Sequence, residues 1–143
     1  MADGKNSGKV LAVDWGSKKI GLAISDETQT LARPLAVLEH TSRADDAKRV
    51  IEAAKQDGAS LIIVGVTYND ENELSPSGRS AQRLAVEIEN QSSIRVIMWD
   101  EDFSTKEMKE TSILTGSPRI KRKGHSDDKA AAIILQSYLD SNQ

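Results

Sequence analysis

The chain has 143 residues, enough for one compact domain and too few for two domains of ordinary size. Its 19 Lys and Arg against 22 Asp and Glu give a net charge of −3, so no overall positive field attracts nucleic acid or anionic lipid. The absence of cysteine excludes disulfide frameworks, thiolate nucleophiles and cysteine-ligated metals. The N-terminus is polar and no apolar run approaches the roughly 20 residues of a membrane span, so we expect a cytoplasmic protein with no membrane partner.

Apolar periodicity predicts an α/β protein. In chain order it predicts strands at 10–14, 20–25 and 31–38, a helix at 44–56, a strand at 61–65, a helix at 80–89, a strand at 95–99, and helices at 105–114 and 127–139. Pro34 restricts the third strand to a sheet edge or a bulge, because proline cannot donate to the ladder. We therefore predict a five-stranded mixed sheet, antiparallel at one side and parallel at the other, with helices on both faces. Residues 1–8 are expected to form a flexible tail, and 9–143 a single domain.

Acidic residues gather where predicted strands end and where the last helix begins. Asp14 ends the first strand, residues 100–102 follow the fifth, and Asp127 and Asp128 open the last helix. Sites in open α/β sheets lie outside the carboxyl ends of the strands, and clustered carboxylates there favour Mg²⁺ or Mn²⁺. Two such ions can hydrolyse a phosphodiester. The alternative is structural, because acids are common in turns and in the first turn of a helix.

Four sequence blocks within residues 10–140 resemble the YqgF family, Holliday-junction-resolvase-like proteins regarded as pre-16S rRNA nucleases. The blocks are VDWGSKKIGLAISD at 13–26, IIVG at 62–65 with GRSA at 78–81, WDEDFST at 99–105, and DDKAAAIILQSYL at 127–139. The resemblance implies an RNase H-like fold, which agrees with the order of elements predicted from periodicity. It also implies a metal-dependent nuclease.

The resemblance implies three catalytic acids. Asp14 matches the acid of the family's first strand, Glu101 the acid after its fifth strand, and Asp127 the acid that opens its last helix. Each would bind Mg²⁺ or Mn²⁺, with Asp14 as the bridge. Asp100 remains the alternative to Glu101, because neighbouring residues of a strand face opposite sides and only one would face the metal. Asp128 remains the alternative to Asp127, because the last helix is apolar nearly all round.

Basic residues near these acids are candidates for nucleic-acid phosphate contacts. They are Lys18, Lys19, Arg79, Arg83, Lys121, Arg122 and Lys123. Asp102 and Lys19 stand where the resembled family usually has arginine. At position 102 the charge that would face a phosphate is reversed, and at position 19 lysine lacks the two parallel N–H donors of a guanidinium group. Trp15 is a candidate for stacking on a base, and His40, beside a polar turn, is expected at the surface.

The resemblance implies an endonuclease that acts on structured RNA, in maturation of the 5′ end of pre-16S rRNA. Two alternatives remain open. One is a Holliday junction resolvase that cleaves branched DNA with the same metal site. The other is a nucleic-acid-binding adaptor whose acids no longer assemble. A competition between RNA and four-way junctions separates the first two functions, and metal titration exposes the adaptor.

Overall fold

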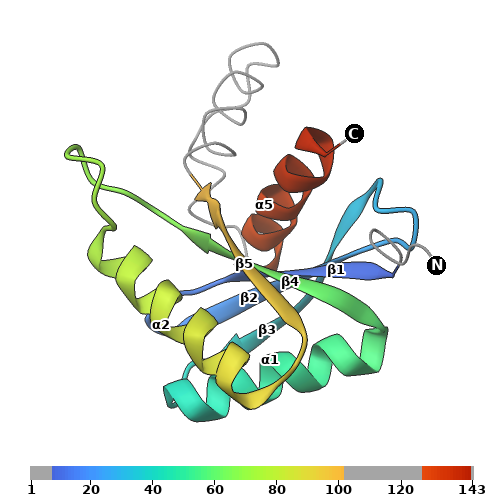
Figure 1. Cartoon of the computed structure of the whole chain (residues 1–143), viewed down its shortest axis with the longest axis horizontal. Coiled ribbons are helices and arrows are strands. Elements are labelled where there is room, and N and C mark those ends of the chain that lie inside the picture. The colour runs from blue at the N-terminus through green and yellow to red at the C-terminus, as the bar shows by residue number, and fades with distance from the viewer. Residues whose placement is uncertain (1–7, 102–126, 143) are drawn as a thin grey trace.

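A computed structural model describes residues 8–101 and 127–142 of the chain (Figure 1). Its strands are β1 (Lys9–Asp14), β2 (Lys19–Ser25), β3 (Ala32–Glu39), β4 (Ala59–Val66) and β5 (Arg95–Asp100). They form one sheet in the order β3-β2-β1-β4-β5. The pairs β1–β2 and β2–β3 are antiparallel, whereas β1–β4 and β4–β5 are parallel. The predicted five-stranded mixed sheet is confirmed, with β1 at its centre.

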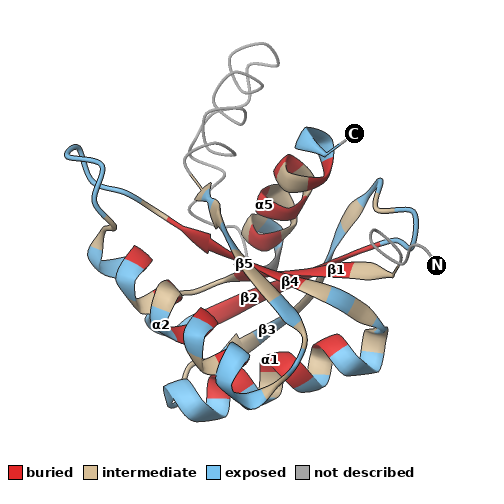
Figure 2. Ribbon diagram, in the orientation of Figure 1, coloured by how far each residue is buried: buried red, intermediate tan, exposed pale blue. Residues whose placement is uncertain are grey.

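Helices cover both faces of the sheet. Helices α1 (Arg43–Asp57) and α2 (Pro76–Gln91) pack on one face, and α5 (Asp127–Ser141) packs on the other (Figure 1). Two apolar clusters result, one between the sheet and α1 and α2, the other between the sheet and α5. The buried residues concentrate in the central strands and on the inner sides of the helices (Figure 2). The predicted helix at 105–114 lies outside the described residues, as does the predicted tail apart from Gly8.

The position of β3 follows from its proline. Strand β3 lies at one edge of the sheet, and its pairing with β2 shifts register between Leu22 and Ala23, opposite Pro34. An edge position leaves one side of the strand without ladder partners, and the register shift absorbs the missing N–H donor. The prediction from Pro34 was an edge position or a bulge, and β3 has both.

The helix boundaries are set by capping residues. Ser42 accepts a hydrogen bond from the Asp45 N–H at 3.1 Å to begin α1, and Gly58 ends it in the left-handed conformation with φ of 77°. Helix α2 begins at Pro76, four residues before the predicted start. Ser75 caps α2 by accepting from the Gly78 N–H at 3.0 Å, and proline suits the first helical turn. The apolar stripe alone could not locate this polar first turn.

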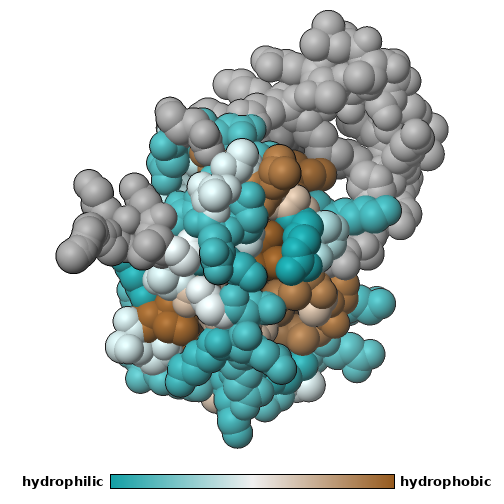
Figure 3. Space-filling model, turned by 90° about the vertical axis from the view of Figure 1, so that its right-hand side faces the viewer, coloured by the Kyte–Doolittle hydropathy of each residue, from teal (hydrophilic) through white to brown (hydrophobic). Residues whose placement is uncertain are grey.

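The described surface carries mixed side chains. On the face drawn in Figure 3, apolar patches lie among hydrophilic side chains. The large apolar side chains that are exposed are Leu31, Val37, Tyr68, Val86 and Met98. No helix within residues 8–101 and 127–142 is long and apolar enough to cross a membrane.

Candidate active site

The carboxyl ends of three parallel strands meet at one edge of the sheet. Asp14 is the last residue of β1, and the strand register pairs Val13 with Val64 of β4. Gly65, the next residue of β4, pairs with Trp99 of β5, two residues before Glu101. The strand ends therefore bring Asp14, Gly65 and Glu101 to the same end of neighbouring strands.

Strand alternation decides which face each acid occupies. Val10 and Ala12 of β1 pack in the cluster under α5, so Asp14, two residues further along, lies on that face. Trp99 of β5 packs in the same cluster, and Glu101 shares its parity. Asp100 has the opposite parity and is exposed. Asp14 and Glu101 thus share the α5 face, and Asp100 does not.

Gly65 makes room for the Glu101 side chain. A Cβ atom at residue 65 would lie 2.7 Å from Glu101 Oε2, 2.8 Å from Glu101 Cγ and 3.0 Å from Ile134 Cδ1. Both Glu101 atoms are closer than a real Cβ could tolerate, so the carboxylate lies directly over the bare backbone of β4. Since β4 is between β5 and β1, the glycine lets Glu101 reach from just beyond the end of β5 toward the strand that ends at Asp14.

The third predicted acid is only partly described. Asp127 begins α5, the helix that covers the face shared by Asp14 and Glu101, but the side chains of Asp127 and Asp128 lie outside the described residues. Among the side chains that are described, no group of three His, Asp or Glu comes together in a way that could hold a metal ion. The two acids present offer hard oxygen donors on one face, which is the donor chemistry that Mg²⁺ and Mn²⁺ prefer. They fit part of such a site.

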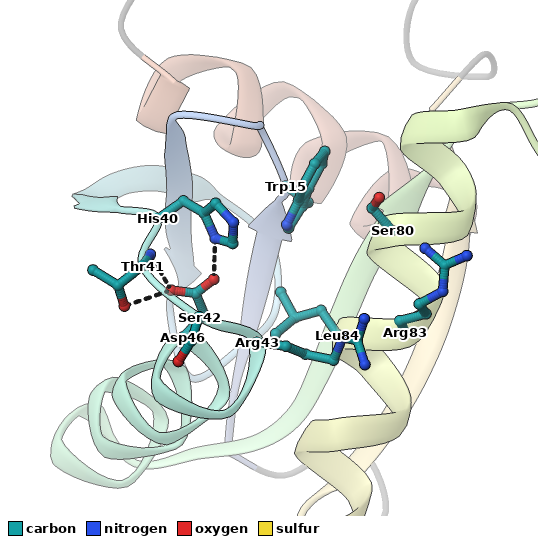
Figure 4. Close-up of a pocket in the computed structure, with 9 residues that line it drawn as sticks. All are labelled: Trp15, His40, Thr41, Ser42, Arg43, Asp46, Ser80, Arg83 and Leu84. Atoms are coloured by element: carbon teal, nitrogen blue, oxygen red, sulfur yellow. Dashed lines mark hydrogen bonds and ion pairs between the residues drawn. The ribbon is translucent and has the colours of Figure 1, made fainter.

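The predicted phosphate contacts occupy different places. Lys18 and Lys19 are exposed where β1 turns into β2. Arg79 is exposed and donates from Nη1 to the Leu74 carbonyl oxygen at 3.0 Å. Arg83, one turn further along α2, lines a cavity on the α1 and α2 side of the sheet (Figure 4). Lys121, Arg122, Lys123 and Asp102 lie outside the described residues.

His40, which the sequence predicted at the surface, lies only partly there. Its ring is half-buried and hydrogen-bonded through Nδ1 to Asp46, whose side chain is 1% exposed. Asp46 also accepts from the Thr41 N–H at 3.1 Å and from Arg49 Nη2 at 2.7 Å. The signal was available, because position 46 falls on the stripe at 47, 50, 51 and 54 that α1 buries. An acid on a buried stripe requires partners, and His40 is one of them.

Ser25 and Asp26 are the last residues of the first sequence block. Their hydrogen bonds stabilise the turn that follows β2, and not the strand ends that carry Asp14 and Glu101. Ser25 Oγ accepts from the Val10 N–H at 2.8 Å and donates to the Asp26 carbonyl oxygen at 2.9 Å. The Asp26 carboxylate accepts from the N–H of Thr30, the hydroxyl of Thr28 and the N–H of Leu31. These bonds stabilise the charged carboxylate and hold the pKa of Asp26 below its ordinary value.

Replacing Gly65 with Ala is expected to reduce activity while leaving the fold intact. The added methyl group would displace the Glu101 carboxylate, and a misplacement of about 1 Å can cost about a hundredfold in rate. The contacted atoms belong to side chains and not to the backbone, and only Ile134 is part of the core, so the midpoint of thermal unfolding should fall only slightly. Cleavage rates of Gly65→Ala, Glu101→Gln and the double variant test this. The double variant should lose little more activity than Glu101→Gln alone, because Gly65 acts through the Glu101 carboxylate. If the rate losses of the two single variants multiply in the double variant, the two residues act independently and this explanation is wrong.

Comparisons with known proteins show the family to which the chain belongs. The family model described as "RuvX: Holliday junction resolvase" matches residues 8–141. A protein of Thermoanaerobacter pseudethanolicus named "Putative pre-16S rRNA nuclease" is 35% identical over 136 residues, covering 94% of this chain and 98% of that protein. A protein of Geobacillus kaustophilus with the same name is 35% identical over 137 residues, covering 94% and 99%.

Solved structures show the same fold at low identity. Thermus thermophilus RuvC in complex with a Holliday junction substrate aligns with a TM-score of 0.64 at 15% identity, covering 94% of each chain. The fowlpox virus Holliday junction resolvase aligns with a TM-score of 0.53 at 18% identity, covering 93% of this chain and 99% of that one. The predicted RNase H-like architecture is therefore confirmed by these resolvase neighbours.

Proposed function

This chain belongs to the family whose model is described as "RuvX: Holliday junction resolvase", and from the names of its relatives we propose that it is a divalent-metal-dependent endonuclease acting on structured RNA, in 5′-end maturation of 16S rRNA. Family membership makes the chain a nuclease, a hydrolase that acts on nucleic acids. The metal, the site residues and the RNA substrate are the proposal. The observation that carries it is the Glu101 carboxylate over Gly65, on the face that strand alternation gives to Asp14.

We propose that Asp14, Glu101 and Asp127 hold Mg²⁺ or Mn²⁺. When bound, the metal supplies positive charge that activates water and stabilises the leaving oxygen of the phosphodiester. Asp14 follows four buried residues of the central strand, so its backbone is fixed by packing on both faces of the sheet. Gly65 leaves the space over β4 that the Glu101 side chain occupies. The chain thereby presents two carboxylates before substrate arrives, which limits the reorganisation that catalysis requires.

The choice of RNA is supported by the names of the two relatives described above, each of which is called a "Putative pre-16S rRNA nuclease". The family description names a Holliday junction resolvase instead, so branched DNA is the second candidate substrate. Both substrates suit the same acids, since a phosphodiester is cleaved in each. A cleavage competition between a precursor 16S RNA and a four-way DNA junction, with Asp14→Asn as the inactive control, decides between them. Preferential cleavage of the junction would overturn the RNA assignment.

The basic segment that precedes Asp127 is expected to bind substrate phosphates. Each neutralised phosphate releases counterions, so three such cations should contribute roughly −2 to −3 to the slope of log affinity against log salt. Replacing Lys121, Arg122 and Lys123 together with Ala should weaken binding to every RNA sequence, flatten that slope and leave the rate at saturating substrate nearly unchanged.

A matched variant controls for net charge. Replacing the exposed residues Lys48, Lys55 and Arg95 with Ala also removes two lysines and one arginine, on the middle and last turn of α1 and at the start of β5. Binding measured by fluorescence anisotropy across a salt series should change far less for this control. Equal losses for both triple variants would mean that only overall charge matters, and that the 121–123 segment holds no phosphates.

A further inference from the structure

A cavity of about 230 Å³ lies on the side of the sheet that α1 and α2 cover (Figure 4). Asp14 and Glu101 lie on the other side, which α5 covers. Its wall includes Trp15, which follows β1, and His40, which follows β3. The helices contribute Arg43 at the start of α1, and Ser80 and Arg83 in the first half of α2. None of these residues belongs to the proposed metal site. The cavity nevertheless adjoins that site, because Trp15 directly follows Asp14 in the chain.

The acid in this cavity is already satisfied. The carboxylate of Asp46 interacts with His40 through one oxygen, and with the Thr41 N–H and Arg49 Nη2 through the other. Arg49 also compensates its charge, since the pair Arg49 Nη2 to Asp46 Oδ1 is 2.7 Å long. Asp46 therefore has little capacity left to neutralise another cation in the cavity.

Two arginines at the cavity are unpaired. Arg43 and Arg83 are exposed, and neither forms a hydrogen bond or ion pair with any residue in the part of the chain that the structure describes. They come from different helices to the same cavity (Figure 4). Two guanidinium groups offer up to ten N–H donors in planar forks, a geometry that matches the oxygens of a phosphate. The cavity is thus locally positive in a chain of net charge −3.

The remaining wall is rigid and partly apolar. The His40 ring meets the Trp15 ring edge to face, with centroids 5.8 Å apart and an interplanar angle of 68°. The bond from His40 to the buried Asp46 fixes the ring, and Trp15 packs against the apolar cluster. A ligand would therefore find its apolar wall in place, and only the two arginines would need to be ordered.

We propose that Arg43 and Arg83 bind a phosphate group of the nucleic-acid strand that passes over the Asp14 edge of the sheet. The inference rests on the proposed function for the identity of the ligand, but its test requires no cleavage. The step from Asp14 to Trp15 crosses from one face of the sheet to the other, so a strand held at the acids can continue into this cavity. The contact would add affinity without reading sequence, as phosphate contacts do.

The test measures binding of an RNA duplex with a single-stranded end, by fluorescence anisotropy in EDTA, for the full chain. Arg43→Ala and Arg83→Ala should each weaken binding about five- to tenfold, and each should reduce the salt slope by about one. Arg95→Ala removes an exposed arginine from the opposite end of β5 and should leave both values unchanged. Unaltered affinity and salt slope in the Arg43→Ala, Arg83→Ala double variant would overturn the proposal.

Two further arms sharpen the result. Comparing 5′-phosphorylated with 5′-hydroxyl strands identifies the bound group. If the arginine variants lose the same affinity for both strands, the bound group is an internal phosphodiester. If they lose affinity only for the phosphorylated strand, it is a terminal phosphate.

Tryptophan fluorescence gives a second readout. In a Trp99→Phe background Trp15 is the sole tryptophan, so its fluorescence reports on the cavity. RNA should change that fluorescence, and the double arginine variant should abolish the change. A chain that binds in this way but does not cleave would contradict the proposed nuclease mechanism and leave the phosphate cavity standing.

Discussion

Asp14→Asn is expected to lower the cleavage rate by about three orders of magnitude while the protein remains folded. The amide keeps the size of the carboxylate but removes the charge that would hold the metal, and a metal contributes several kcal/mol to this class of reaction. Asp14 lies half-buried at the end of β1, and the change relieves repulsion from the acid on the same face. Single-turnover cleavage and circular dichroism measure the two expectations.

The metal dependence of stability provides the control for this variant. Without metal, the thermal midpoint of Asp14→Asn should equal or exceed that of the natural sequence. With saturating Mg²⁺, only the natural sequence should gain stability, because a ligand that binds the folded state raises the midpoint. Cleavage at the natural rate by Asp14→Asn would remove Asp14 from the mechanism.

Glu101→Gln should lose about a hundredfold to a thousandfold in activity, whereas Asp100→Asn should stay close to the natural rate. The two residues are neighbours and both changes convert a carboxylate into its amide, so each variant is the control for the other. Only Glu101 lies over Gly65 on the α5 face, while Asp100 is exposed with the opposite parity. Cleavage assays at saturating and limiting Mg²⁺ measure the difference in rate between the two variants. If Glu101→Gln is slow because it binds the metal weakly, this difference should become smaller as the Mg²⁺ concentration rises.

The reverse ranking has a definite meaning. If Asp100→Asn is inactive and Glu101→Gln is not, the end of β5 must rotate when substrate binds, so that Asp100 reaches the metal. The position of Glu101 over Gly65 then contributes only to packing. If both variants are active, the metal site does not include the end of β5.

The mixed sheet could be predicted because its signals are local and periodic. The hairpin of β1 and β2 shows as two apolar runs around a turn, the edge position of β3 follows from Pro34, and the buried β4 shows as a continuous β-branched run. The start of α2 could not be found from the apolar stripe, because Ser75 and Pro76 define it through capping and fixed backbone geometry. Boundaries of this kind depend on single residues, not on periodicity.

The residue types of the candidate site could be predicted from the sequence, but their arrangement in space could not. Alternation indicated that Asp100 and Glu101 face opposite sides, but it could not decide which side meets Asp14 without the sheet order. Gly65 was visible as part of a sequence block, yet its role depends on a contact with a residue 36 positions later. The cavity at Trp15 was missed for the same reason, since it forms where β1, α1 and α2 meet.

The most direct test of the central claim is a crystal structure soaked in Mn²⁺, with anomalous diffraction used to locate the metal. We expect an anomalous peak within about 2.0–2.5 Å of carboxylate oxygens of Asp14 and Glu101, with Asp127 completing the site. A crystal in which these acids are ordered and no peak lies between them, at an Mn²⁺ concentration that supports cleavage in solution, would contradict the account.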